Sequence, residues 1–76
     1  MTENIPSENR FGETIRNARK AKGLSQKQLG LLCGYENPKT AETSVQYWEY
    51  NTAPVPIDRL RRLCAALDLP LDALIP

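Results

Sequence analysis

The segment of residues 23–34 constrains the fold most, because it contains both the start and the stop signal of one short helix. Ser25 is an N-cap candidate, and Gln28 three residues later completes a capping box. Gly34 favours the left-handed conformation in which many helices end. These two boundaries predict a helix over residues 26–33.

The remainder of the chain is predicted to be helical as well. Apolar residues recur at helical spacing, and no useful length of sequence alternates with a period of two. The fold class is therefore all-α, with mostly short connections. We predict five helices: one from Phe11 to Lys22, one over residues 26–33, one that ends near Tyr50, one from Pro56 to Leu67, and a short one after Pro70.

The sequence leaves the start of the third helix open. Thr40 can cap it, and Thr43 with Gln46 forms an alternative capping box. Residues 35–40 are rich in turn-forming side chains and are predicted to form a loop before the helix.

Gly30 lies in the middle of the predicted helix over residues 26–33. Glycine in a helix interior costs about 1 kcal/mol relative to alanine. Either this weakness is simply tolerated, or another helix crosses here so closely that no side chain fits.

The chain is short enough for one domain at most. Residues 1–10 are polar and contain Pro6, so we expect a flexible N-terminal arm, followed by a single domain over residues 11–76. The polar start does not resemble a secretory signal, and no run of eighteen apolar residues predicts a membrane span. The expected location is the cytoplasm.

Composition argues against an enzyme or a metal protein. The 76 residues include no histidine, which is the commonest general base and the commonest zinc ligand. We expect neither cofactor nor metal. Cys33 and Cys64 fall on the apolar phase of helices and are predicted to be buried thiols, with a disulfide or redox role as the alternative. The net charge of +1 gives no bulk argument for nucleic acid, so any such argument depends on placement.

Residues 11–75 resemble the Cro/phage-repressor-type (XRE-family) DNA-binding domains. The matching segments are RNARKAKGLSQKQLGLLCG (16–34), SVQYWEYN (44–51) and IDRLRRLCAALDLPLDALI (57–75). The resemblance implies a compact five-helix, lambda-repressor-like domain with the helix-turn-helix at helices 2 and 3.

The chain departs from the family pattern in several places. Gly30 stands where the family usually has alanine, and Asn51 stands where it usually has glycine. The connection from Gly34 to Val45 is about five residues longer than in the shortest members, which predicts a loop and a late start for the third helix. Residues 52–54 are neutral where the family often carries Lys or Arg.

By this resemblance, the third helix enters the major groove of DNA. The residues implied to read bases are Glu42, Thr43, Ser44, Gln46 and Tyr47. Those implied to contact phosphates are Arg19, Gln26, Lys27 and Lys39. Each has an ordinary alternative, such as a helix cap, a place on the core rim or a solvated lysine.

The resemblance also implies a structural ion pair between Arg19 of the first helix and Glu49 at the end of the third. Trp48 is on the inward phase, so core packing is preferred over stacking on bases. The arginines at 59, 61 and 62 form a basic cluster that is either a solvated face or a phosphate site.

These features predict a sequence-specific, double-stranded-DNA-binding transcriptional regulator, a repressor of phage, prophage or bacterial type that is nucleoid-associated. We expect a weak homodimer on a near-palindromic operator, with Leu71, Leu74 and Ile75 at the dimer contact. The alternative is a protein-binding module of the same fold, such as an antitoxin or regulatory subunit, with a toxin or antirepressor as partner.

Overall fold

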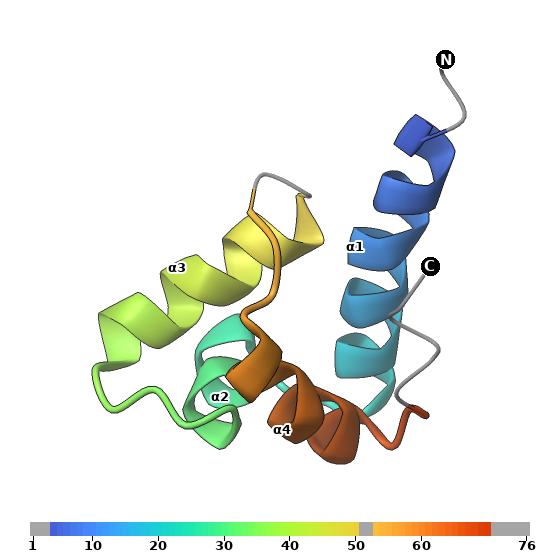
Figure 1. Cartoon of the computed structure of the whole chain (residues 1–76). Coiled ribbons are helices and arrows are strands. Elements are labelled where there is room, and N and C mark those ends of the chain that lie inside the picture. Colours follow the sequence, from blue (N-terminus) through green and yellow to red (C-terminus); the bar gives the residue numbers. More distant parts are fainter. Residues whose placement is uncertain (1–3, 51–52, 71–76) are drawn as a thin grey trace.

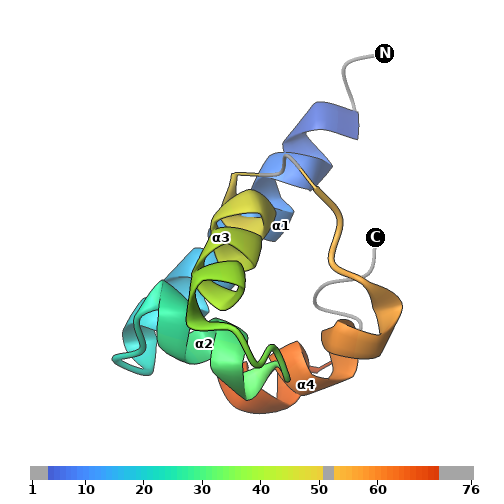
Figure 2. The same cartoon turned by 90° about the vertical axis from the view of Figure 1, so that its left-hand side faces the viewer.

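The computed structural model describes residues 4–50 and 53–70, and these residues form an all-α structure. Its helices are α1 (Asn4–Ala21), α2 (Gln26–Leu32), α3 (Pro38–Glu49) and α4 (Ile57–Leu67). α2 packs mainly against α3, and α4 lies next to α2 and the end of α1 (Figures 1 and 2). The four described helices agree with the all-α prediction. The fifth helix expected after Pro70 lies outside the described residues.

α1 begins at Asn4, well before the start predicted at Phe11. The segment of residues 4–10 is therefore helical, and the predicted start is wrong. The prediction treated Pro6 as incompatible with a helix. Proline is tolerated in the first turn, because the first four N–H groups of a helix have no partner within it. Whether residues 1–10 act as a flexible arm stays a prediction.

The start of α2 forms as its local signals predict. The Ser25 hydroxyl accepts from the Gln28 N–H at 3.0 Å, and the Gln28 side chain accepts from the Ser25 N–H at 2.8 Å. α2 ends at Leu32, and Gly34 follows with a φ of 101°, a conformation that favours glycine. The helix predicted over residues 26–33 is confirmed to within one residue.

α3 begins earlier than the sequence indicated. The Asn37 side-chain oxygen accepts from the backbone N–H groups of Lys39 and Thr40, at 2.9 and 3.1 Å, and Pro38 is the first helical residue. Neither Thr40 nor Thr43 is the cap. The loop predicted over residues 35–40 is therefore shorter than expected, because α3 already begins at Pro38.

One hydrophobic core joins the four helices. Its buried members are Ile15, Leu29, Cys33, Val45, Trp48, Leu60, Leu63, Cys64 and Leu67. Trp48 is only 3% exposed, which confirms core packing rather than a surface for stacking bases. Ile57 is apolar but 78% exposed, and it is the first residue of α4.

Cys33 and Cys64 are both buried and both thiols are free. Burial raises the pKa of Cys33 from 9.0 to about 11, although the charges of Arg59 and Arg62 act in the opposite direction. Burial also raises the pKa of Cys64. Both groups are therefore protonated at neutral pH and poorly suited to thiolate chemistry.

These thiols predict a loss of stability at high pH. A folded-state pKa above the unfolded value means that the contribution of Cys33 is complete below pH 9.0 and is lost as the pH rises toward about 11. Melting temperatures measured from pH 7 to pH 11 should fall more steeply for the native protein than for Cys33→Ala. Equal slopes would contradict the prediction. A bulky thiol reagent should label Cys33 only after the protein unfolds.

Candidate nucleic-acid interface

The outward side of α3 carries the residues that were predicted to read bases. Glu42 and Tyr47 are exposed, whereas Thr43, Ser44 and Gln46 are half-buried. At 3.6 residues per turn, Ser44 is rotated by roughly 160° about the helix axis from Gln46. The structure therefore brings Glu42, Thr43, Gln46 and Tyr47 onto one broad face and places Ser44 on its far flank.

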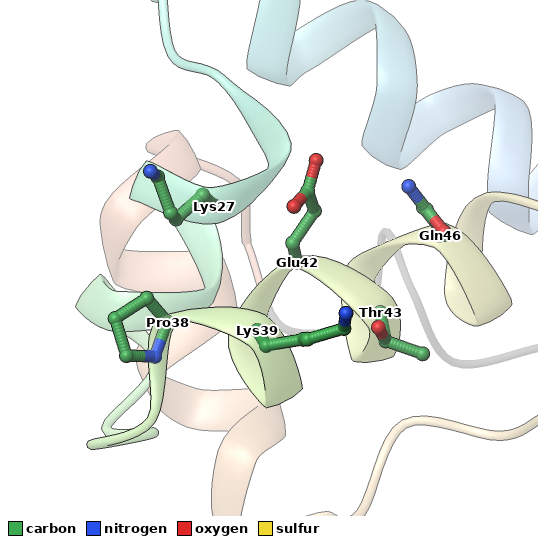
Figure 3. A pocket seen from close by; sticks show the side chains of 6 residues that line it. All are labelled: Lys27, Pro38, Lys39, Glu42, Thr43 and Gln46. Atoms are coloured by element: carbon green, nitrogen blue, oxygen red, sulfur yellow. The ribbon is translucent and has the colours of Figure 1, made fainter.

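An open hollow of ≈ 430 Å³ lies between α3 and the start of α2. Its lining residues are Lys27, Pro38, Lys39, Glu42, Thr43 and Gln46. Figure 3 shows Glu42 and Gln46 pointing to the same side of α3, with Lys27 across from them on α2. The hollow thus collects five of the residues predicted to contact DNA, two of them cationic.

Arg19 of α1 and Glu49 of α3 form a buried ion pair. The Arg19 Nε donates to Glu49 Oε2 at 2.6 Å and its Nη2 to Glu49 Oε1 at 3.3 Å. The Arg19 Nη1 donates to the carbonyl of Leu24 at 2.9 Å, which ties α1 to the turn before α2. Arg19 is 9% exposed and Glu49 is 4% exposed, so the pair is buried.

Gln26, the first residue of α2, joins this pair to the outer face of α3. Its Nε2 donates to Glu49 Oε1 at 3.1 Å, and its Oε1 accepts from Gln46 Nε2 at 3.2 Å. The sequence prediction placed Gln26 at a phosphate and missed both of these contacts. They link residues 20 and 23 positions apart, so no local sequence signal could have indicated them.

Arg59 of α4 holds the turn that connects α2 and α3. Its Nη1 donates to the carbonyl of Cys33 at 3.2 Å, and its guanidinium lies 4.2 Å from the centre of the Tyr35 ring. A cation is favourable beside the C-terminus of a helix, where carbonyls are unsatisfied. Arg59 is thus a structural residue of the turn, a role that the sequence had not indicated for the basic cluster.

The sequence did contain one overlooked signal for the site. Asn37 followed by Pro38 combines a favoured N-cap with a favoured first helical residue. Because Pro38 starts the helix, Lys39 lies in the first turn of α3 and lines the hollow.

The described residues 4–50 and 53–70 contain no group of three or more Cys, Asp or Glu side chains arranged to hold a metal ion. Within the same residues, no helix is both long and apolar enough to cross a lipid bilayer.

The comparison with protein families identifies the class. Residues 15–74 match the model of a helix-turn-helix family. The chain therefore belongs to the Cro/repressor-type (XRE) helix-turn-helix family, as its sequence motifs predicted. Members of this class are DNA-binding helix-turn-helix regulators. Neither the curated proteins nor the solved structures that we searched contain a significant match.

Proposed function

We propose that this protein is a transcriptional repressor of phage or prophage type that binds a specific sequence of double-stranded DNA. The observation that carries the proposal is the polar outer face of α3, which borders a hollow flanked by lysines of α2 and α3. An α-helix fits the major groove, where each base pair presents a distinct pattern of donors and acceptors. The polar side chains of α3 read that pattern.

Individual residues have distinct roles in this proposal. Thr43 offers a hydroxyl to a base edge and a methyl group to thymine, Glu42 accepts from the amino group of cytosine, and Gln46 pairs with adenine. Tyr47, which is about half exposed, contacts the rim of the groove. Ser44 lies on the far flank of α3 and is the weakest candidate of the set.

The phosphate contacts fall to Lys27 and Lys39, both exposed at the hollow, and to the second Nε2 hydrogen of Gln26. Arg19 has a different position. Three of its donors already bind Glu49 and Leu24, and it is nearly buried, so its contribution to DNA binding is chiefly architectural.

The protein works in the cytoplasm, at the nucleoid, as a weak homodimer on a near-palindromic operator. Half-sites then lie about one helical turn apart, roughly 10 bp from centre to centre. The dimer contact that we expect from Leu71, Leu74 and Ile75 lies outside the described residues. Sedimentation with and without a palindromic duplex tests the dimer directly.

A second candidate function is supported by the exposed apolar side chains of Leu31 and Leu32 on α2, which are 41% and 54% exposed. Such residues suit a protein-binding module that would take a toxin or an antirepressor as its partner. Stable association with a non-self protein, together with no binding to any duplex, would favour this candidate.

Substitutions on the two sides of the hollow should have different effects. Thr43→Ala should change the preferred base at one position, with a cost of about 1–3 kcal/mol for the original operator. Lys27→Ala should weaken all sequences evenly and reduce the salt slope by about one unit. Competition against a random duplex library at several salt concentrations measures both effects.

Arg61→Ala serves as the control, because it removes the same charge from α4, which does not line the hollow. It should leave the base preference unchanged. If the unmodified protein prefers no sequence over bulk DNA, the proposed function is wrong. If Thr43→Ala only lowers the melting temperature, the assignment of the reading face is wrong.

A further inference from the structure

A chain of four side chains runs from the buried ion pair to the reading face. Arg19 donates to Glu49, Glu49 accepts from Gln26, and Gln26 accepts from Gln46. The chain starts at a residue of α1, passes through the first residue of α2, and ends on α3 where Gln46 lines the open hollow. It connects a group without access to DNA to a side chain that borders the proposed site.

The direction of each hydrogen bond in this series of side chains is determined by Glu49 at its buried end. An ionised carboxylate can only accept hydrogen bonds, whereas a glutamine amide has a donating and an accepting end. Glu49 therefore binds Nε2 of Gln26, which turns the Oε1 of Gln26 toward Gln46. That oxygen in turn requires a donor, so the Nε2 of Gln46 points at Gln26. Each amide is fixed in one of its two orientations by the preceding group.

The groups that remain available on Gln46 follow from this arrangement. One of its two N–H groups is committed to Gln26, which leaves one N–H and the Oε1 acceptor. One donor beside one acceptor matches adenine, which presents the N7 acceptor and the N6 amino group in the major groove. Guanine presents two acceptors, N7 and O6, and would require two donors from the same amide.

We propose that Glu49, acting through Gln26, is a positioning residue that determines base specificity by fixing the amide of Gln46 in its adenine-reading orientation. This inference rests on the proposed function, since it assigns the specificity of the same face. Arg19 has an indirect part in it, because its guanidinium donates to the Glu49 carboxylate and holds it in place.

Reversing the polarity of the middle group tests the proposal. Lysine at position 26 can only donate, so Gln26→Lys still satisfies Glu49 but obliges Gln46 to turn its Oε1 toward position 26. Both N–H groups of Gln46 then face the groove. The preferred base at the position read by Gln46 should change from adenine to guanine, with each preference about tenfold. Gln26→Met, which neither donates nor accepts, should instead relax the preference.

The experiment compares the native protein with four variants against a random duplex library. Gln46→Ala identifies the base position that Gln46 reads, and Gln26→Lys and Gln26→Met are then scored at that position. Gln28→Lys is the matched control, because it introduces the same change two residues further along α2 without contact to Gln46. It also removes the acceptor of the Ser25 N–H, so binding is measured at a temperature where this variant is fully folded. The control should keep the adenine preference.

The possible results separate the inference from the function on which it rests. A change of the preferred base from adenine to guanine with Gln26→Lys, but not with Gln28→Lys, supports the proposed control of the Gln46 amide by Gln26. Retention of adenine by Gln26→Lys, or no effect of Gln46→Ala, overturns the inference and leaves sequence-specific binding intact. A native protein without any sequence preference overturns both.

A measurement without DNA provides an independent check. In the ¹⁵N-labelled protein, the side-chain NH₂ resonances of Gln46 should shift when Gln26 is replaced by methionine or lysine, because one of their hydrogens loses its acceptor. They should stay in place in Gln28→Lys. Unchanged resonances in the Gln26 variants would show that the amides are not coupled and would overturn the proposal.

Discussion

Replacing Arg19 with methionine is expected to lower the free energy of unfolding by about 3–5 kcal/mol. Glu49 is 4% exposed, so its carboxylate would remain buried without its cation, with Gln26 as its remaining side-chain donor. The Leu24 carbonyl would lose its donor at the same time. At 0.05–0.15 kcal/mol per residue, a domain of 76 residues has about 4–11 kcal/mol of stability in total. Arg19→Met should therefore lose a large fraction of the stability of the domain, from about a quarter to all of it.

Urea unfolding followed by Trp48 fluorescence measures this loss, because the indole is buried in the folded state. Lys22→Met is the matched control. It breaks another ion pair between a side chain near the end of α1 and a distant carboxylate, Asp68, but that pair is exposed to solvent. Its cost should stay within about 1 kcal/mol. Equal costs for the two variants would contradict the assignment of Arg19 and Glu49 as a buried structural pair.

The double variant Arg19→Met/Glu49→Leu separates the two contributions. Removing one partner leaves an uncompensated buried charge, whereas replacing both by apolar side chains removes that penalty. The double variant should therefore recover part of the stability that Arg19→Met loses. If it is less stable than Arg19→Met, the ion pair itself, rather than the stranded carboxylate, accounts for the cost.

The helix boundaries show what local sequence can and cannot determine. The start of α2 is predictable because Ser25 and Gln28 cap each other within four residues. The start of α3 is harder to place, because Asn37 and Thr40 are both favoured caps three residues apart and only the proline after Asn37 distinguishes them. The backbone chooses Asn37, where Pro38 supplies a helical φ at the next position. A difference of one turn then decides whether Lys39 belongs to a loop or to the recognition helix.

Some features of the candidate site could likewise be predicted from the sequence, and others could not. The outward face of α3 follows from helical periodicity once Val45 and Trp48 are assigned to the core, so Thr43 and Tyr47 could be placed from sequence. The contacts of Gln26 could not, because they depend on how closely α2 and α3 approach each other. That approach depends on Gly30, because a side chain at this position would meet the backbone of Ala41.

Gly30→Ala is expected to destabilise the protein even though alanine is the better helix former. An added Cβ would lie 2.6 Å from the carbonyl carbon of Ala41 and would also meet its carbonyl oxygen. Real Cβ atoms do not approach backbone so closely, so α2 and α3 must separate. Overpacking of this kind costs about 1–3 kcal/mol, whereas the gain in helix propensity is about 1 kcal/mol. The close helix crossing, and not tolerated weakness, explains this glycine.

Three variants test whether the close approach of α2 to the backbone of Ala41 explains Gly30. Urea unfolding should show Gly30→Ala to be less stable than the native protein, while Leu32→Ala, on the exposed side of the same helix, should change stability little. Ala41→Gly should not rescue Gly30→Ala, because the obstacle includes the backbone of residue 41 as well as its methyl group. A more stable Gly30→Ala would mean that propensity outweighs packing at this crossing.

The same substitution should impair binding beyond its effect on folding. Separation of α2 from α3 lengthens the distance between Gln26 and Gln46, whose hydrogen bond is already 3.2 Å long. Gly30→Ala should thus lose base preference at a temperature where it is still fully folded, because the reading face of α3 keeps its residues but loses its position relative to α2. Under the proposed function, the missing side chain at residue 30 therefore contributes to recognition even though Gly30 is buried.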